Sequence, residues 1–239
     1  HRAKSVRDVI YHLKYLAESL AVSDPSLFRE YVEWCTVIMQ NIGIDRENFA
    51  RNLICMRDAA AEEAGEGAAA VLQAYFAPAL QAVTEEPDMP QSFIVQENPL
   101  YKEAVRYLEL LLQTNRRSAS EFIIQLFENG TSIRDIYSSI FQPVQREIGR
   151  LWQINNISVA QEHFCTAATQ LIMSQLYPHL FSGTGGGKVF LAACAGPELH
   201  EIGVRMVADF FEMEGWDTCF LGANTPGHTI LETVKKIQP

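Results

Sequence analysis

The sequence predicts an α and α/β protein, in which a long helical region is followed by the start of a doubly wound parallel sheet. Two observations lead to this fold class. Apolar residues recur at three- and four-residue spacing from the beginning of the chain to about residue 180, as they do along packed helices. Beyond that point the pattern changes to short unbroken apolar runs that alternate with amphipathic segments, which is typical of buried parallel strands joined by helices.

Residues 1–90 are expected to form an N-terminal helical domain. Asp24 precedes Pro25, which is the pattern of a helix cap followed by a first-turn proline, and Gly43 follows as a left-handed stop. The stretch 85–91 contains two prolines among charged and polar residues. It therefore predicts a linker to the next domain.

Residues 91–181 are expected to form a four-helix bundle, because four helical segments follow one another with short connections. The pair Ser158-x-x-Gln161 is a capping-box pattern at the start of the last and longest helix. The other expected boundaries are Asn98 with Pro99 at the start of the first helix, Gly130 at the end of the second, and Thr131 or Ser132 and about Gly149 at the two ends of the third.

Residues 182–239 predict the start of a Rossmann-like domain. The glycine-rich stretch 182–187 predicts a flexible hinge before it. The order of elements after the hinge is strand, helix, strand, helix, as in an open flavodoxin-like sheet, and the domain is incomplete because two parallel strands do not make a stable sheet. The strands are expected at 188–194 and 217–222, and the helices at 199–215 and 225–237.

Composition excludes several classes of protein. Of the 239 residues, 48% are apolar and 10% aromatic, but no apolar run approaches the ~20 residues of a membrane span, and no secretory signal is present, so a cytoplasmic location is expected. The five cysteines form no C-x-x-C pair, which favours buried thiols over a disulfide framework or a zinc site. The net charge of −10 opposes direct binding of nucleic acid, so a gene-regulatory output would need another domain or a partner.

The first chemical motif is Glu198-x-His200-x-x-Gly203, just after the first expected strand. Doubly wound sheets bind their ligands beyond the carboxyl ends of the strands. A histidine there can give one ring nitrogen to a metal while an acid such as Glu198 holds the other. Gly203, which has no side chain, would let a bulky ligand approach the backbone. The residues alone equally allow a surface loop with a helix-capping acid.

Residues 196–203, placed after a strand and a helical bundle, resemble the D-x-H-x-x-G signature of cobalamin-binding domains, with Glu198 in place of the aspartate. The same replacement is found in the light-sensing branch of that family. The resemblance implies that His200 displaces the nucleotide base and becomes the cobalt ligand on the lower face of the corrin. It covers residues 98–239.

A second motif lies upstream, where Trp152, Glu162 and His163 follow a W-x9-E-H pattern. This pattern resembles the photoreceptor type of cobalamin protein, in which the bundle caps the upper corrin face. By resemblance, Trp152 packs against the adenosyl group of adenosylcobalamin, Glu162 contacts it, and His163 becomes the upper cobalt ligand after light breaks the cobalt–carbon bond. The residues alone also fit a core aromatic and an exposed first helical turn.

The first 95 residues resemble the helical N-terminal region of cobalamin-binding sensors, including photocobilins, which pair cobalamin with a linear tetrapyrrole. Biliverdin is therefore a candidate second chromophore, and a bilin needs an apolar slot with polar groups for its pyrrole nitrogens and propionates. Ordinary core or dimer packing explains the same aromatic residues. The candidate bilin contacts are His12, Tyr15, Tyr31, Trp34 and Arg51, with Cys35 and Cys55 as candidate attachment points or as buried thiols.

The sequence thus predicts a cobalamin-binding light sensor rather than an enzyme, acting through a homo-oligomer or an effector protein, with no membrane partner. Two other functions stay open. A corrinoid methyl carrier for a methyltransferase system has the same two-domain core, although Trp152 and His163 would obstruct its upper face. A cofactor-free interaction module would keep the fold without the ligand, which the presence of His200 and Gly203 argues against.

Overall fold

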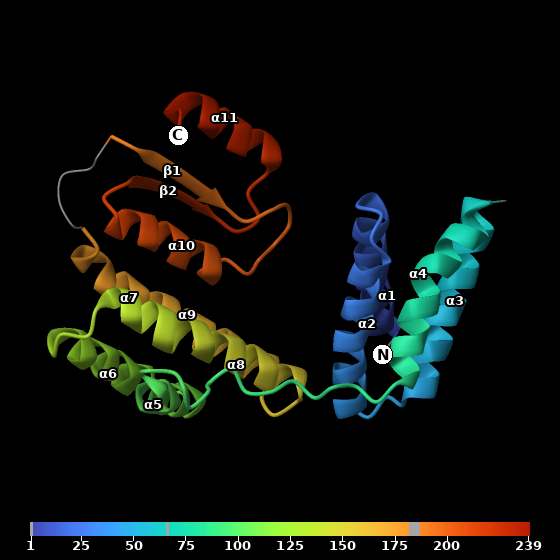
Figure 1. Ribbon diagram of the computed structural model, residues 1–239, viewed down its shortest axis with the longest axis horizontal. Helices are drawn as coiled ribbons and strands as arrows, with labels where there is room; N and C mark the ends of the chain where they lie inside the picture. Colours follow the sequence, from blue (N-terminus) through green and yellow to red (C-terminus); the bar gives the residue numbers. More distant parts are fainter. Residues whose placement is uncertain (1, 66, 182–186) are drawn as a thin grey trace. The chain divides into compact units, whose positions relative to one another are not determined.

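The computed structural model, which describes residues 2–65, 67–181 and 187–239, has the predicted fold class, a helical region followed by a small parallel sheet (Figure 1). The described chain divides into two compact units. One contains the residues up to Gln91 together with Gln153–Asn156, and the other contains Ser92–Trp152 and Ile157–Pro239. Each unit has its own cluster of buried apolar side chains. The division into domains 1–90, 91–181 and 182–239 stays a prediction.

The first unit is built from α1 (Arg2–Ala21), α2 (Pro25–Asn41), α3 (Arg46–Ala64) and α4 (Ala68–Thr84). The predicted cap of α2 is confirmed, because an Asp24 carboxylate oxygen accepts a hydrogen bond from the backbone N–H of Ser26 at 2.9 Å. Gly43 has a φ of 83° just beyond the helix, as a left-handed stop requires. Phe28, Leu53 and Phe76 from three of the helices are fully buried in the core of this unit.

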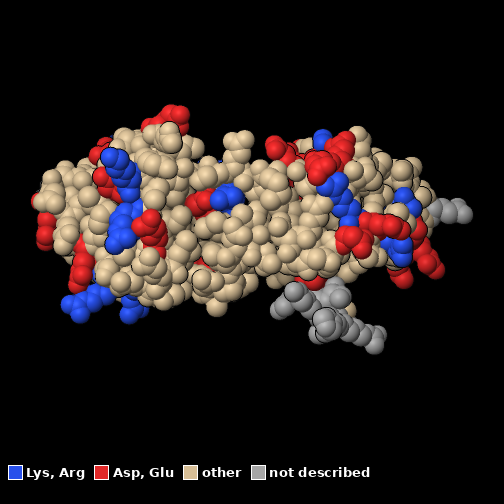
Figure 2. Space-filling model, turned by 90° about the horizontal axis from the view of Figure 1, so that it is seen from below, with Lys and Arg blue, Asp and Glu red and all other residues tan. Residues whose placement is uncertain are grey.

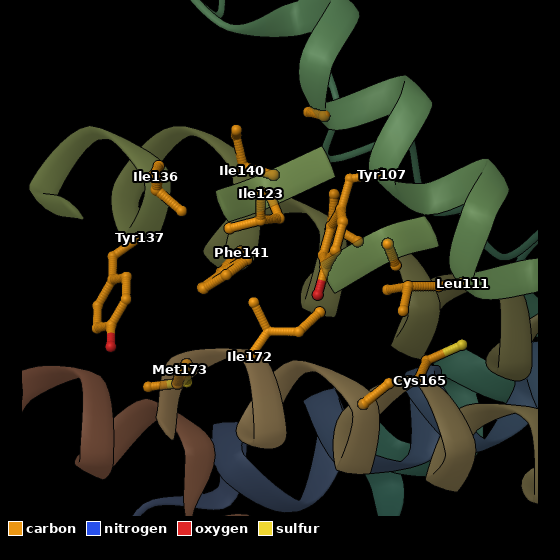
Figure 3. Packing of buried hydrophobic residues seen from close by; sticks show 14 of the residues in the cluster. Tyr107, Leu111, Ile123, Ile136, Tyr137, Ile140, Phe141, Cys165, Ile172 and Met173 are labelled. Carbon is orange, nitrogen blue, oxygen red and sulfur yellow. The ribbon is translucent and has the colours of Figure 1, made fainter. Parts of the chain in front are cut away.

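The second unit begins with the predicted bundle, formed by α5 (Tyr101–Leu112), α6 (Arg116–Glu128), a composite third helix and α9 (Val159–Leu176), which ends in the 3-10 turn η2 (Tyr177–His179). The third helix consists of α7 (Ile133–Asp135), the π-helical segment η1 (Ile136–Phe141) and α8 (Gln142–Gln153). Figure 3 shows large side chains from α5, α6, η1 and α9 meeting in one core, including Tyr107, Ile123, Phe141 and Ile172.

Two helix boundaries in the bundle differ from the predicted ones. Asn98 does not cap the first bundle helix, which starts at Tyr101; its side chain instead accepts from the Leu100 backbone N–H and donates to the Ser139 carbonyl, so it holds a turn before the helix. Gly149 does not end α8, which continues to Gln153. The helix runs through the glycine because Ile148 on one side of it is buried in the bundle core.

The predicted strands and helices after the bundle are confirmed, except that the helices begin at Ile202 and Gly227 instead of 199 and 225, which leaves His200 in a loop. β1 (Val189–Ala193) and β2 (Asp217–Gly222) pair in parallel, and α10 (Ile202–Met213) and α11 (Gly227–Ile237) follow them. α10 packs on two surfaces, because Phe211 stacks on Phe190 of β1 at 3.9 Å between ring centroids while Met206 is buried against the bundle core. The predicted hinge falls on residues 182–187, of which only Gly187 lies within the described part.

The predicted burial of the cysteines is confirmed for three of the five. Cys35, Cys165 and Cys194 are buried as expected, but Cys219 is only half-buried and Cys55 is exposed, because it lies on the outer face of α3. On the face drawn in Figure 2, acidic and basic side chains are intermixed rather than gathered into a basic stripe. Within the described residues, no helix is long and apolar enough to cross a membrane.

Candidate functional site

The loop after β1 is held against the loop after β2 at the carboxyl ends of the two strands. The backbone N–H of Asn224 donates to the Glu198 carbonyl at 3.1 Å, and the N–H of Cys194 donates to the Gly222 carbonyl at 3.0 Å. These two hydrogen bonds join the loops to each other. This is the edge at which sheets of this class bind their ligands.

Glu198 and His200 are brought together in this loop. One Glu198 carboxylate oxygen lies 2.5 Å from His200 Nδ1 and accepts from the backbone N–H groups of Leu199 and His200, each at 2.7 Å. The hydrogen bond from the His200 N–H lowers the pKa of Glu198, and the His200 side chain and the Leu199 N–H act in the same direction. Because the carboxylate occupies Nδ1, Nε2 is the ring nitrogen that faces a ligand, on a side chain that is 89% exposed.

Gly203 lies in the first turn of α10, close to the acid–histidine pair. A Cβ atom added to it would meet no other atom within 4 Å, so the space above this backbone is open. A flat, bulky ligand could therefore approach the helix start there.

The second predicted pair occupies the first turn of α9. The Ser158 capping box is formed as predicted: Gln161 N–H donates to Ser158 Oγ at 3.3 Å, and Ser158 N–H donates to Gln161 Oε1 at 3.1 Å. The helix start thus fixes Glu162 and His163, and a Glu162 carboxylate oxygen contacts His163 Nδ1. The His163 side chain is 75% exposed while that of Glu162 is mostly covered, so the imidazole is the outward group of the pair.

A chain of polar side chains supports Glu162 from inside the bundle. Thr166 Oγ1 lies 3.1 Å from both Glu162 Oε1 and Gln145 Oε1, and Gln145 Nε2 donates to Thr169 Oγ1 at 2.7 Å. The Thr169 hydroxyl in turn lies 2.9 Å from the hydroxyl of the buried Tyr107. Sequence reasoning missed this chain. A weak signal was present in Glu162, Thr166 and Thr169, whose spacing of four and three residues puts them on one face of α9.

Trp152 lies in the last turn of α8, where it is partly buried against the bundle core cluster. The three residues of the upstream motif therefore come from two bundle elements, with Trp152 on α8 and the other two on α9. The downstream motif comes from the β1–α10 loop and the start of α10. All six predicted site residues belong to the same compact unit.

Four of the five candidate bilin contacts gather on α1 and α2. His12 Nδ1 lies 2.9 Å from the Tyr31 hydroxyl, and Tyr31 stacks on Tyr15 with 3.8 Å between ring centroids and on Trp34 with 6.3 Å. Burial lowers the pKa of His12, which favours its neutral imidazole. Arg51 belongs to α3, where its guanidinium pairs with Glu47.

The two candidate attachment thiols differ in reactivity. Burial raises the pKa of the Cys35 thiol to about 12, which keeps it protonated and unreactive. Cys55 is exposed and open to reagents. Of the two, only Cys55 is accessible for covalent attachment of a chromophore.

The side chains of the two motifs suit a cobalt corrin better than a bare metal ion. Within the described ranges, no group of three or more histidine, cysteine or acidic side chains could hold a bare metal ion. A corrin brings its own nitrogen ligands, so the protein would need to offer at most one imidazole on either side of it. His200 and His163, each with Nδ1 turned to a glutamate, fit that requirement. A surface pocket of about 660 Å³ lies elsewhere in this unit and is lined by residues such as Arg116, Phe164 and Gln175. None of the six predicted site residues lines it.

Comparison with family models gives two matches. Residues 104–177 match the B12 binding domain, which is the stretch from α5 to the end of α9. Residues 1–83 match the phycobilisome protein family, which is almost the whole of the first unit's four helices.

Two known proteins resemble part of this chain. The HTH-type transcriptional repressor CarA of Myxococcus xanthus is 23% identical over 120 residues, which cover 49% of this chain and 40% of the repressor. The monomethylamine corrinoid protein of Methanosarcina barkeri superposes with a TM-score of 0.51 at 18% identity, over 57% of this chain and 65% of that one. The chain therefore spans less than two thirds of either relative. The B12 model match and the shared fold support a cobalamin-binding family.

Proposed function

We propose that this protein is a light sensor that holds adenosylcobalamin between the bundle and the sheet and changes the ligand above the cobalt when illuminated. The observation that carries the proposal is the paired arrangement of the two histidines. Each has Nδ1 turned to a neighbouring glutamate, and each is exposed. One stands on the bundle stretch that matches the B12 binding domain and the other at the ligand edge of the sheet.

Each of the predicted site residues would have its own role in binding the cofactor. His200 would bind the lower face through Nε2, with Glu198 fixing its tautomer and raising its basicity. Trp152 would provide an apolar wall for the nucleoside above. Glu162, held by Thr166, would keep His163 oriented with Nε2 outward. When bound, adenosylcobalamin supplies the photochemistry, because light breaks its cobalt–carbon bond.

A bilin in the first unit forms the second part of the proposal. The match of residues 1–83 to the phycobilisome protein family supports it, since phycobilins are linear tetrapyrroles. The stacked rings of Tyr15, Tyr31 and Trp34 would supply the flat apolar surface that a tetrapyrrole needs. The neutral His12 next to the Tyr31 hydroxyl would supply a polar group for the pyrrole nitrogens.

The first experiment mixes the protein with adenosylcobalamin in the dark, removes unbound ligand by gel filtration, and records absorption before and after green light. We expect retained corrinoid and a stable shift to a two-imidazole spectrum. His163→Ala should leave dark binding intact but prevent the illuminated species, because only the upper imidazole is lost. His200→Ala should alter the dark spectrum, because the lower imidazole is lost.

His179→Ala is the matched control, because this histidine lies in the turn after α9 and packs on Phe127, which belongs to neither motif. It should behave as the unmodified protein does. Dark and illuminated spectra that are the same in all variants would refute the proposal. Retained corrinoid that accepts methylcobalamin equally well and forms no two-imidazole state would favour the methyl carrier, and no retained corrinoid would favour the interaction module.

A further inference from the structure

Gln170 and Glu201 form a polar link between the bundle and the loop that carries His200. Gln170 Nε2, on α9, donates to Glu201 Oε1 at 3.0 Å, and the backbone N–H of Ala223, just after β2, donates to Glu201 Oε2 at 3.0 Å. The two oxygens of one carboxylate therefore join three elements. Glu201 is the residue next to His200, so the link ends directly beside the proposed lower ligand.

Two further contacts show that this junction is closely packed. Gly222 ends β2 with a φ of 74°, and a Cβ added to it would come within 2.9 Å of Glu201 Oε2. Arg205, on the next turn of α10, donates to the Gln170 carbonyl at 3.4 Å and to Ser174 Oγ at 2.8 Å. The glycine makes room for the carboxylate, and the arginine holds the same stretch of α9.

The link is attached to α9 at a fixed distance from His163. Gln170 follows His163 by seven residues, which corresponds to roughly 10 Å along the axis of an α-helix. The helix is one continuous segment from Val159 to Leu176, so this separation is rigid. One end of the helix carries the proposed upper ligand, and the Gln170 position is tied to the residue beside the proposed lower ligand.

We infer that Gln170 and Glu201 are positioning residues that set the spacing between His163 and His200 and thereby the gap in which the cofactor is held. The inference rests on the proposed function. Neither residue needs to touch the cofactor. Their role is to keep the loop after β1 at a fixed place along α9, so that each imidazole can reach its own face of the same corrin.

The test reverses the polarity of the link. Gln170→Glu places two carboxylates against each other, and repulsion should separate the loop from α9. In the double variant Gln170→Glu/Glu201→Gln, the amide again faces a carboxylate, and its carbonyl oxygen can still accept from the Ala223 N–H. Gln175→Glu is the matched control: it adds the same charge to the same helix, and its side-chain oxygen can still accept from Ser120, as it does at 2.7 Å in the unmodified protein.

The first readout needs no cofactor. Nitroxide labels at Ala167→Cys on α9 and Leu199→Cys in the loop, both exposed positions, are introduced in a Cys55→Ala/Cys219→Ala background and their distance distribution is measured. We expect Gln170→Glu to broaden the distribution and shift it to longer distances. The double variant should return it to that of the parent, and Gln175→Glu should leave it unchanged.

The second readout is made on label-free protein loaded with adenosylcobalamin. We expect Gln170→Glu to retain the cofactor through His200 but to lower the yield of the two-imidazole state by on the order of tenfold, the effect of losing one charge-assisted hydrogen bond. The double variant should restore the yield. A loss of stability unrelated to this pair would not be reversed by restoring the amide–carboxylate contact, so restored label distances together with a restored yield separate positioning from a merely structural role.

Parental distances and yield in Gln170→Glu, or a defect that the double variant does not reverse, would overturn the inference. Failure of the proposed function has a different signature, because the unmodified protein would then retain no cofactor or show no light response. The label distances would still show in that case whether the link holds the loop to α9.

Discussion

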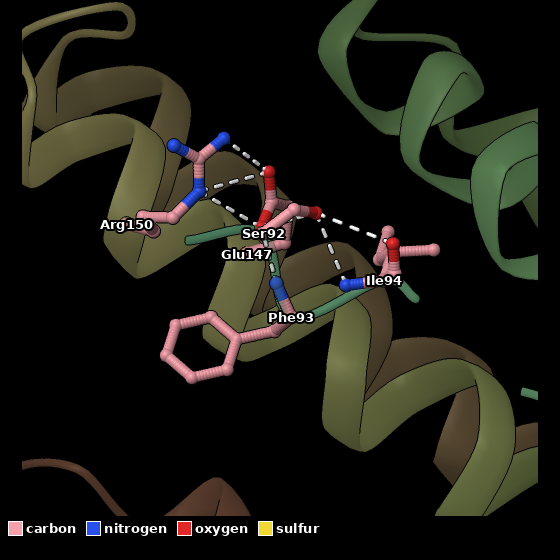
Figure 4. A network of polar contacts seen from close by, with 5 residues as sticks. All are labelled: Ser92, Phe93, Ile94, Glu147 and Arg150. Atoms are coloured by element: carbon pink, nitrogen blue, oxygen red, sulfur yellow. Dashed lines mark hydrogen bonds and ion pairs between the residues drawn. The ribbon is translucent and has the colours of Figure 1, made fainter. Parts of the chain in front are cut away.

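At the scale of single residues, Glu147 is a buried carboxylate that accepts hydrogen bonds from three neighbouring residues. Its side chain is 5% exposed and accepts hydrogen bonds from Ser92 Oγ at 3.1 Å and the Phe93 N–H at 2.9 Å, while Arg150 Nη2 donates to it at 2.6 Å (Figure 4). Burial by itself would raise the pKa of Glu147, but the hydrogen bonds from Arg150, Phe93 and Ser92 outweigh it and lower the pKa. The carboxylate fixes the start of this unit onto α8, five residues before Trp152.

We predict that Glu147→Gln lowers the free energy of unfolding by about 3 kcal/mol at pH 7, because Arg150 loses its charged partner in a covered site. A carboxyl whose pKa is lowered by folding contributes stability above its ordinary pKa of 4.5 and loses it as pH falls through the lowered pKa. The difference between variant and parent should therefore shrink below pH 4.5. Urea unfolding at pH 7 and pH 3 measures it.

The control for this substitution is Glu109→Gln, which removes the carboxylate of an exposed pair with Arg106. Such surface pairs contribute about 0–1 kcal/mol. If both glutamine variants had the same small effect, Glu147 would not anchor the start of the unit.

At the scale of elements, the π-helical segment η1 decides how the bundle meets α10. Four of its six residues, Ile136, Tyr137, Ile140 and Phe141, are buried. The Tyr137 hydroxyl donates to Asp209 of α10 at 2.8 Å, inside the interface. Burial raises the pKa of Asp209, and the hydrogen bond from Tyr137 partly offsets that rise.

We predict that Tyr137→Phe destabilises the protein by about 2 kcal/mol at pH 8, because it leaves a buried carboxylate without its hydrogen-bond donor. A carboxyl whose pKa is raised by folding costs stability as pH rises above its ordinary value, and removing the donor enlarges that cost. The effect should therefore be smaller at pH 4 than at pH 8. Thermal unfolding at the two pH values measures it.

Tyr107→Phe is the matched control, because this tyrosine is equally buried but its hydroxyl bonds the neutral Thr169. Its effect on stability should not change between pH 4 and pH 8. A loss of stability in Tyr137→Phe that is likewise independent of pH would mean that the Tyr137 hydroxyl does not stabilise the ionised carboxylate of Asp209.

At the scale of the whole molecule, the chain has two separate hydrophobic cores and two proposed ligands. The first core is centred on residues such as Phe28, Leu53 and Phe76, and the second on Tyr107, Leu111 and Phe141. The two family matches fall on different units. Each ligand should therefore stabilise its own core, because a ligand raises the unfolding temperature only of the unit whose folded form it binds.

Calorimetry on two matched core variants tests this. Leu53→Ala and Leu111→Ala each remove a fully buried leucine, at a cost of about 3 kcal/mol, and should each lower a different unfolding transition. Adenosylcobalamin in the dark should raise the transition that Leu111→Ala lowers, and biliverdin the one that Leu53→Ala lowers. A single transition that both ligands raise would contradict two independent units.

The sequence by itself determined the class of each segment, because helix caps, glycine stops and apolar periodicity act over a few residues. The Asp24 and Ser158 caps, the Gly130 stop with a φ of 95° and the strand at 217–222 were all predicted correctly. It also predicted the two acid–histidine pairs, since each pair lies within three residues of chain. The roles of these residues stay a prediction.

Only the tertiary structure decided which distant groups support those pairs. Glu147 meets Phe93 across 54 residues, Tyr137 meets Asp209 across 72, and Gln170 meets Glu201 across 31. None of these contacts follows from local spacing, because each depends on how two elements pack. The passage of α8 through Gly149 has the same origin, since burial of side chains in the bundle core outweighed the local preference of the chain.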